Sequence, residues 1–242
     1  MRYALISDIH ANLEALQAVL KDIESRKVDR IHCLGDIVGY GCDPVECVDL
    51  IIQHCDIRLM GNHEYVVLGL HDMEHLNDIA RISMEWTQEQ LTDRELSILA
   101  DLQMDAEIEN AYLVHASPYE PDRWHYVLAI PEAKKALENL HHPIGFIAHS
   151  HLPRIFSGYP DGECGSKVGH DFHPDPEYRY LVNVGSVGQP RDNDARSCYV
   201  IYDTNKQEIC YHRVEYNVKL TQAKMSDANV HRMLVERLEV GR

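Results

Sequence analysis

Five short stretches of the sequence contain side chains that can bind metal or transfer protons, and each follows an apolar run. They read SDIH at 7–10, GD at 35–36, GNHE at 61–64, VH at 114–115 and AHSH at 148–151. Each has a structural explanation when taken singly, because aspartate often forms turns or helix caps and a lone histidine in an apolar run is usually a core residue. Five such stretches at corresponding positions of one chain instead indicate a common site.

The donor atoms in these stretches suit transition metals. Two carboxylates, one amide oxygen and four imidazoles, without a thiolate, favour Mn, Fe, Co, Ni or Zn over Ca. The set is large enough for two metal ions if one carboxylate bridges them. Because residues i and i+2 of an extended chain point the same way, we expect Asp8 with His10, and His149 with His151, each to converge on one site. The predicted metal ligands are Asp8, His10, Asp36, Asn62, His115, His149 and His151, and His63 is left over.

The apolar runs before these groups predict strands that deliver them to one edge of a sheet. In α/β proteins, ligands gather where the carboxyl ends of strands meet the following loops. Strands are predicted at 2–7, 30–34, 56–60, 106–115, 144–149, 154–157, 179–184, 197–203 and 207–216. Helices are predicted at 12–26, 43–55, 131–141 and 226–239, with two more within 73–102 separated at Thr92, and an exposed loop at 158–177.

The order of these elements predicts an α/β fold in a single domain over 1–242. Strands alternate with helices in the first part of the chain and dominate later, which favours two sheets packed face to face with helices outside. The chain is long enough for one large hydrophobic core, and no segment has the composition of a linker.

Charge and cysteine content restrict the class of protein. Lys and Arg number 23 and Asp and Glu 39, and the resulting net charge of −16 disfavours a broad nucleic-acid surface or an anionic membrane as partner. We find no secretory signal pattern and no apolar window of membrane-spanning length. Seven cysteines without a CxxC motif suit a reducing compartment. We therefore expect a cytoplasmic protein, and the sequence does not indicate its oligomeric state.

In their order along the chain, the five stretches resemble the signature of the calcineurin-like metallophosphoesterases. That signature is D-x-H, G-D, G-N-H-[DE], H and G-H-x-H, and it is matched here from DIH at 8–10 to AHSH at 148–151. The resemblance covers about the first 200 residues and implies a four-layer αββα sandwich of two mixed β-sheets with a dinuclear metal centre. It also implies that Asp8, His10 and His151 hold one metal, that Asn62, His115 and His149 hold the other, that Asp36 bridges them, and that His63 is catalytic.

Two departures from the family pattern concern the site. The glycine that usually precedes His-x-His is Ala148, and Gly39 and Tyr40 stand where protein phosphatases of this superfamily carry an Asp-Arg pair after the bridging aspartate. This loop therefore lacks a phosphate-binding arginine and a carboxylate partner for the catalytic histidine. Instead, the stretches GDIVGYG, ECVDLI and NVGSVGQPRDND resemble the small stand-alone bacterial and archaeal phosphodiesterases.

The resemblance implies a metal-dependent phosphoesterase that hydrolyses a small phosphodiester or nucleotide through a hydroxide bridging two divalent transition-metal ions. His63 would protonate the leaving oxygen or stabilise its developing charge. The alternatives are a dinucleoside polyphosphate hydrolase, a phosphomonoesterase or phosphoprotein phosphatase, and a non-catalytic interaction module on the same fold. The missing arginine disfavours a monoesterase, and the complete set of site residues disfavours the interaction module.

Asn12, Tyr40 and Arg191 are candidate substrate contacts, and two of them have a structural alternative. Asn12 also suits the N-cap of the helix at 12–26. Arg191 either supplies positive charge to the site or pairs with Asp192 or Asp194 on the surface. The candidates to line a pocket for a base are Tyr40, Tyr119, Trp124 and His125.

Three further residues near these motifs have less specific roles. Glu64 either accepts a hydrogen bond from His63 and orients it, or lies in the first turn of a helix near the positive end of its dipole, and the second explanation is favoured. His170 and His173 lie in the predicted loop at 158–177 and are expected to be solvated.

Overall fold

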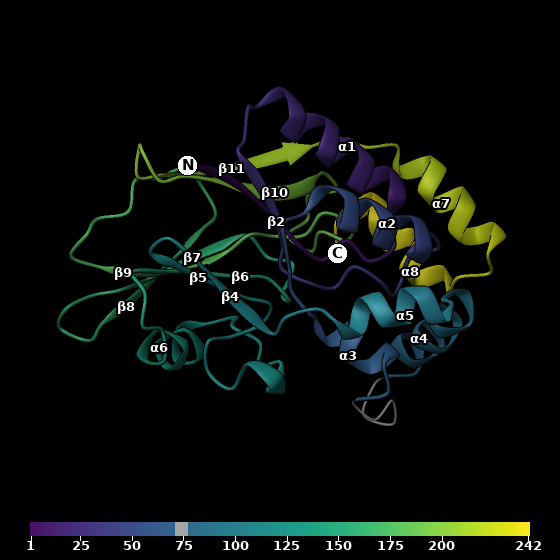
Figure 1. Ribbon diagram of the computed structural model, residues 1–242, viewed down its shortest axis with the longest axis horizontal. Coiled ribbons are helices and arrows are strands. Elements are labelled where there is room, and N and C mark those ends of the chain that lie inside the picture. Colours follow the sequence, from purple (N-terminus) through teal and green to yellow (C-terminus); the bar gives the residue numbers. More distant parts are fainter. Residues whose placement is uncertain (71–76) are drawn as a thin grey trace.

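The computed structural model contains two β-sheets that pack face to face, with helices on both outer sides (Figure 1). It describes residues 1–70 and 77–242. The first sheet consists of β1 Arg2–Ile6, β2 Arg30–Cys33, β3 Ile57–Arg58, β10 Ser197–Asp203 and β11 Glu208–Val214. The second consists of β4 Asp105–Ile108, β5 Ala111–Val114, β6 Ile144–Ile147, β7 Arg154–Gly158, β8 Cys164–Val168 and β9 Arg179–Asn183.

Both sheets are mixed. The strand order is β11-β10-β1-β2-β3 in the first sheet and β4-β5-β6-β9-β7-β8 in the second. The strands β1, β2 and β3 are parallel, as are β5, β6 and β9, whereas β10, β4 and β7 run antiparallel to their neighbours. The helices are α1 Leu13–Ser25, α2 Pro44–His54, α3 Asn62–Val67, α4 Asp78–Gln90, α5 Asp93–Ala100, α6 Ile130–Glu138, α7 Val218–Asp227 and α8 Arg232–Val240.

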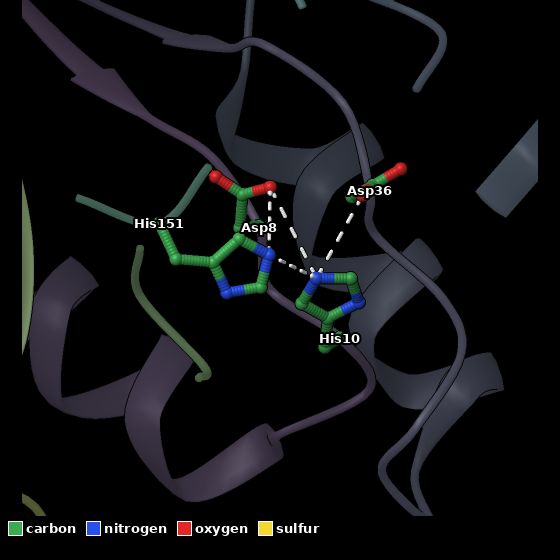
Figure 2. Close-up of side chains that lie close together, drawn as sticks. All are labelled: Asp8, His10, Asp36 and His151. Carbon is green, nitrogen blue, oxygen red and sulfur yellow. Dashed lines mark hydrogen bonds and ion pairs between the residues drawn. The ribbon is translucent and has the colours of Figure 1, made fainter. Parts of the chain in front are cut away.

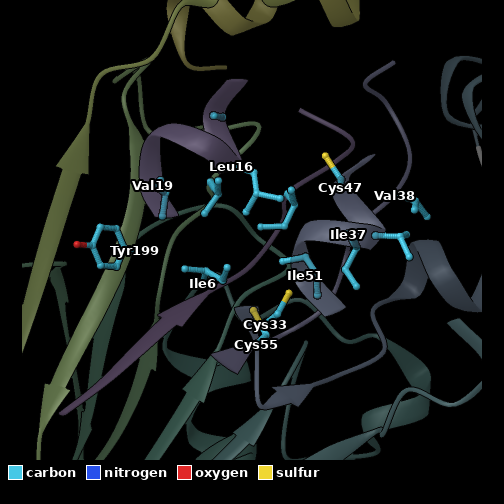
Figure 3. Packing of buried hydrophobic residues seen from close by; sticks show 14 of the residues in the cluster. Ile6, Leu16, Val19, Cys33, Ile37, Val38, Cys47, Ile51, Cys55 and Tyr199 are labelled. Carbon is cyan, nitrogen blue, oxygen red and sulfur yellow. The ribbon is translucent and has the colours of Figure 1, made fainter. Parts of the chain in front are cut away.

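The alternation of side chains along each strand divides the core into layers. In β1, Tyr3 and Leu5 point between the two sheets, whereas Ala4 and Ile6 join the apolar residues of α1 and α2 on the outer face. Figure 3 shows Ile6 among Leu16 and Val19 of α1. On the other side, apolar residues of α6 pack against the outer face of the second sheet. The layers are therefore helix, sheet, sheet and helix, which confirms the predicted αββα sandwich.

The parallel strands end at one edge of the molecule, and the loops that follow them are bonded to each other. The backbone N–H of Asp8 donates to the carbonyl of Gly35 at 3.0 Å, and that of His10 donates to the carbonyl of Asp36 at 3.0 Å. In the second sheet, the N–H of Ala148 donates to the carbonyl of His115 at 2.8 Å. The predicted ligands at the strand ends are thus held on backbones that are fixed relative to one another.

Most predicted elements are confirmed within one to three residues, and Thr92 caps α5 as expected. The predicted strand at 106–115 is instead a hairpin of β4 and β5, because Glu109 adopts a left-handed backbone (φ 47°) and turns the chain. Part of the predicted loop at 158–177 forms β8, a polar edge strand paired with β7. Residues 73–76 of the predicted helical region lie outside the described residues.

The C-terminal region contains two helices where one was predicted at 226–239. Helix α7 begins after Asn217, whose side chain accepts the N–H of Leu220 at 3.1 Å, and α8 is a separate helix. The sequence signal for α7 is weak because only Thr221 and Met225 of this helix are buried. That the chain forms one domain stays a prediction. Within the described residues, no helix is both long and apolar enough to cross a membrane.

Candidate metal centre

Four side chains from three loops converge on one point, as Figure 2 shows. The Nε2 atoms of His10 and His151 face each other at 3.1 Å. Oδ1 of Asp8 lies 3.4 Å from Nε2 of His151, and Oδ2 of Asp36 lies 3.7 Å from Nε2 of His10. All four side chains are buried. They form the first ligand group.

A second ligand group shares Asp36 with the first. Nε2 of His115 lies 3.3 Å from Oδ2 of Asp36, and a ring nitrogen of His149 lies within 4.8 Å of both atoms. The other carboxylate oxygen of Asp36 accepts the backbone N–H of His63 at 3.0 Å, which fixes the orientation of the carboxylate. One oxygen atom therefore lies between two sets of histidines, as a bridging ligand requires.

Backbone carbonyls fix which nitrogen of each histidine carries the proton. Nδ1 of His10 lies 3.3 Å from the carbonyl of Val38, and Nδ1 of His151 lies 2.6 Å from the carbonyl of Gln189. Because a carbonyl only accepts, each Nδ1 donates and each Nε2 keeps its lone pair. The two facing Nε2 atoms therefore repel each other unless a cation lies beside them. Their 3.1 Å separation is that of neighbouring ligands on a metal with bonds of about 2.0–2.2 Å.

Several buried polar atoms of the two groups have no hydrogen-bond partner within the described residues. They include both carboxylate oxygens of Asp8, Nε2 of His115 and Nε2 of His149. Oδ1 of Asn62, the first residue of α3, is also buried without a partner. Buried groups are rarely left unpaired in native proteins, so these atoms indicate that something else satisfies them. Divalent cations fit this set of nitrogen and oxygen donors.

The electrostatics of the cation-free site support the same conclusion. Burial raises the pKa of Asp8 to about 8, so its carboxylate needs a neighbouring positive charge to remain ionised at neutral pH. Burial lowers the pKa of His149 to about 3, so its imidazole is neutral and can offer a lone pair to a metal. Burial also opposes the charged form of His115, but the carboxylates of Asp36, Asp8 and Glu64 together outweigh it and raise that pKa to about 9. A metal at this position would displace the proton of His115.

The backbone at the ligands is in a conformation that side chains other than glycine seldom adopt. Positive φ angles occur at Asp8 (50°), His10 (49°), Asp36 (51°), His149 (64°) and His151 (58°). Asp8 and His10 converge on one group as expected, but the expected extended backbone is wrong for both pairs. Strands end before these residues, and His149 and His151 join different ligand groups. Left-handed residues clustered at one place are typical of functional sites, where neighbouring contacts enforce the strain.

Comparison with known proteins agrees with this geometry. A model of the calcineurin-like phosphoesterase superfamily domain matches residues 1–207. The chain belongs to this superfamily. It is 39% identical to the uncharacterized protein MJ0912 of Methanocaldococcus jannaschii over 99% of this chain and 98% of that protein. It is also similar to the crystal structure of a metallophosphoesterase from Sphaerobacter thermophilus, with a TM-score of 0.88, 36% identity, and coverage of 100% of this chain and 99% of the other.

A shorter similarity involves a nucleotide hydrolase. The symmetrical bis(5′-nucleosyl)-tetraphosphatase of Erwinia tasmaniensis is 32% identical over 90 residues, which are 37% of this chain and 31% of that protein.

In this member of the superfamily, Glu64 holds the loop after β2 and the start of α3 together. Its carboxylate is buried and accepts backbone N–H groups of Asp36 (2.8 Å), Ile37 (2.7 Å), Val38 (3.1 Å) and Gly61 (2.8 Å). It lies in the first turn of α3, as favoured, but its main contacts are with the loop after β2, and within the described residues it makes no hydrogen bond to His63. The sequence pattern could not reveal this role because the partners are backbone groups of a distant loop.

His63 lies at the centre of the site, and none of the described residues gives it a carboxylate partner. Its ring centroid is 4.6 Å from that of His10 and 4.5 Å from that of Tyr40, and its buried Nδ1 has no hydrogen-bond partner within the described residues. A Cβ on Gly39 would lie 2.1 Å from this Nδ1. Glycine at position 39 therefore makes room for the imidazole, and no side chain can replace it without displacing His63.

The three candidate substrate contacts lie in different surroundings. Asn12 caps α1 by accepting the N–H of Ala15 at 3.2 Å and donates to the carbonyl of Gly188 at 2.8 Å, so the structure supports its capping role. Tyr40 packs against His63, as described above, and its ring centroid lies 4.7 Å from that of His10. Arg191 forms no surface ion pair with its neighbours, because Asp192 pairs with Arg213 and Asp194 pairs with Arg196; its guanidinium donates instead to Oε1 of Gln189.

The loop after β5 covers the second ligand group. Trp124 packs edge-on against His115 with ring centroids 6.0 Å apart. Tyr126 stacks on His149 with ring centroids 4.0 Å apart, and it belongs to none of the five sequence stretches. Tyr119 and His125, in the same region of the chain, line a cavity of about 180 Å³. His170 and His173 are exposed, as expected.

Proposed function

We propose that the protein is a metal-dependent phosphoesterase that hydrolyses a small phosphodiester or nucleotide at a centre of two divalent transition-metal ions. The observation that carries this proposal is the position of Asp36. Its Oδ2 lies 3.3 Å from Nε2 of His115 and 3.7 Å from Nε2 of His10, so one carboxylate serves two histidine groups. Two cations sharing one carboxylate are the arrangement that phosphate ester hydrolysis commonly uses.

The residues divide into two ligand sets, with Mn, Fe, Co, Ni and Zn as the candidate ions. When bound, the two cations supply Lewis-acid activation of water and positive charge for the phosphate. The first set is Asp8, His10 and His151, the second is Asn62, His115 and His149, and Asp36 is common to both.

Two residues of the chain act on the ester itself in this proposal. His63 is buried beside the ligands and offers a ring N–H to the leaving oxygen, which stabilises the charge that develops there. Arg191 brings positive charge to the Tyr40 side of the centre, with its guanidinium carbon 5.9 Å from the Tyr40 ring centroid. The local charge thus favours an anionic substrate despite the net charge of −16.

A dinucleoside polyphosphate hydrolase is the second candidate. The similarity of part of this chain to the Erwinia tetraphosphatase favours it. A phosphomonoesterase or phosphoprotein phosphatase is less favoured, because Gly39 and Tyr40 replace the arginine that would bind a dianionic monoester. A non-catalytic module is least favoured because His63 and both ligand sets are present.

A screen of metals against substrates tests the proposal. Purified protein loaded with Mn, Ni, Co, Fe or Zn would be assayed with bis(p-nitrophenyl) phosphate, p-nitrophenyl phosphate, a cyclic nucleotide and a dinucleoside tetraphosphate. We expect metal-dependent turnover that is faster on the diester or the dinucleotide than on the monoester. Faster turnover of the monoester than of the other substrates would instead indicate a phosphomonoesterase or phosphoprotein phosphatase. No turnover with any metal, together with no effect of His63→Ala, would favour the interaction module.

The proposal includes a compartment and partners. We propose a cytoplasmic protein whose partner is the small phosphate ester, with neither a nucleic-acid surface nor a membrane involved. All seven cysteines are free, which suits a reducing environment.

A further inference from the structure

A cavity of about 630 Å³ lies between α4 and α8, next to the metal centre. Tyr40 and Arg237 line it together with an apolar wall that includes Ile79, Met233 and Leu234. Figure 1 shows α8 between α7 and α4. The volume is in the range of pockets that hold nucleotide-sized ligands, and an apolar wall with a few polar groups is typical of them.

Tyr40 separates this cavity from the catalytic side chains. One side of the residue lines the cavity, while its ring centroid lies 4.7 Å from that of His10 and 4.5 Å from that of His63. Arg191 lies over the same ring. A ligand that extends past Tyr40 would therefore reach from the metal centre into the cavity.

Two guanidinium groups lie near this cavity, Arg237 in its lining and Arg191 over the ring of Tyr40, and neither has a side-chain carboxylate partner in the described part of the chain. Arg191 donates to the neutral Gln189, and Nε of Arg237 donates to the main-chain oxygen of Arg242. Acidic residues are not scarce in this protein, since 39 residues are Asp or Glu and Asp192 and Asp194 nearby pair with other arginines. Asp78 at the cavity lies 3.5 Å from Arg81 and is mostly exposed.

The electrostatics of Arg237 agree with this arrangement. Burial, with the charge of Arg191 adding to it, lowers the pKa of Arg237 to about 10. Two like charges near each other repel, and an anionic ligand between them would relieve this repulsion.

We propose that this cavity binds the distal part of a nucleoside polyphosphate substrate, with a second phosphate group between Arg191 and Arg237 and the base against Ile79, Met233 and Leu234. The inference rests on the proposed function and narrows its substrate class. The phosphorus that is attacked lies at the metal centre, and the next phosphate lies beyond Tyr40. Arg237 was not selected from the sequence, because it belongs to no motif and reaches the site only through the packing of α8.

Calorimetric binding of two non-hydrolysable ligands to the metal-loaded protein tests the proposal. The ligands are phosphonate analogues of AMP and ADP, which differ by one phosphate group. We expect the ADP analogue to bind at least about tenfold more tightly, the gain of one charge-assisted contact, and Arg237→Met to abolish this difference. The control Arg232→Met lies on the same helix, exposed and paired with Glu236, and should preserve it.

The outcomes separate this inference from the proposed function. Equal affinity of wild-type protein for both analogues, or a difference that survives Arg237→Met, would overturn the cavity assignment even if the protein hydrolyses phosphodiesters. Loss of the difference in Arg237→Met, in a protein that turns over no ester, would support the cavity and overturn the hydrolase. If Arg237→Met does not fold, Arg237→Lys and the salt dependence of wild-type binding provide the same test. The ADP preference should then decrease in the lysine variant and with added NaCl.

Discussion

His10 and His151 point their Nε2 atoms at each other across 3.1 Å, although both atoms are acceptors because each Nδ1 faces a backbone carbonyl. The fold thus holds two lone pairs in contact within a buried site. A cation converts this repulsion into coordination, so the stability of the protein should depend on metal.

Removing metal should lower the melting temperature. A ligand that binds only the native state at about 100 times its Kd adds about 2.7 kcal/mol to the free energy of unfolding. For a chain of this length that corresponds to about 5–10 °C. Scanning calorimetry before and after EDTA treatment, with MnCl2 added back, measures the shift. A melting temperature unchanged by EDTA and by added Mn would contradict a resident metal.

Asp36→Asn should remove more metal than Asp8→Asn. Asp36 belongs to both ligand groups, whereas Asp8 belongs to one. We expect the metal content measured by atomic emission to fall from about two ions per chain to well below one in Asp36→Asn, and to about one in Asp8→Asn. Equal losses in the two variants would show that Asp36 is not shared.

His63→Ala should reduce kcat without removing metal. Loss of a positioned proton donor costs about 100- to 10,000-fold in rate. The metal content should remain that of the wild type, because His63 is absent from both ligand groups. His170→Ala, which alters an exposed histidine, is the matched control and should retain full activity. A variant that loses metal in parallel with kcat would instead make His63 a ligand.

Glu64→Gln should destabilise the protein far more than Glu132→Gln. Both glutamates are the third residue of a helix and accept the N–H of the preceding cap residue. Glu64 accepts three more N–H groups and is buried, whereas Glu132 is exposed. An amide nitrogen in place of one oxygen would face N–H donors, and we expect a loss of about 2–4 kcal/mol in the free energy of unfolding, measured by urea denaturation. Equal effects of the two substitutions would disprove the loop-binding role.

Lys224→Met should weaken the attachment of α7. Nζ of Lys224 lies 2.8 Å from Glu14 and 2.6 Å from Asp43, both of which are nearly buried. Removing the ammonium leaves two carboxylates close together, and we expect a loss of about 1–3 kcal/mol in the free energy of unfolding. Lys219→Met on the same helix removes an exposed pair with Glu239 and should cause a much smaller loss, because solvent screens this pair. Urea denaturation measures both variants. Similar losses in the free energy of unfolding would contradict the stronger contribution expected of the more buried ion pairs.

The residues that carry the chemistry could be recognised from the sequence because they follow strands. Apolar runs predict strands, and parallel strands end at the same edge of a sheet, so Asp8, Asp36 and His115 could be expected together. The apolar run before Asp8 likewise predicted strand β1, which the structure shows to be buried on both faces. These inferences depend only on local periodicity and on the order of elements along the chain.

Local sequence patterns did not predict the segments whose structure depends on a neighbouring strand, helix or loop. The polar strand β8 forms because β7 offers it an unpaired edge, and α7 forms although it buries few side chains. The left-handed backbone at Asp8 and His10 is enforced by hydrogen bonds to the loop at 35–36, which no pattern around residues 7–10 contains.

The sequence alone therefore determined the fold class, the family and the choice of candidate metal ligands, because spacing and residue type depend on the chain itself. The tertiary structure decided which carboxylate oxygen lies between the two histidine groups and that Glu64 joins two loops. It also placed Arg237 in the lining of the cavity next to Tyr40. These relationships join residues far apart in the chain, and they exist only after the sheets and helices have packed.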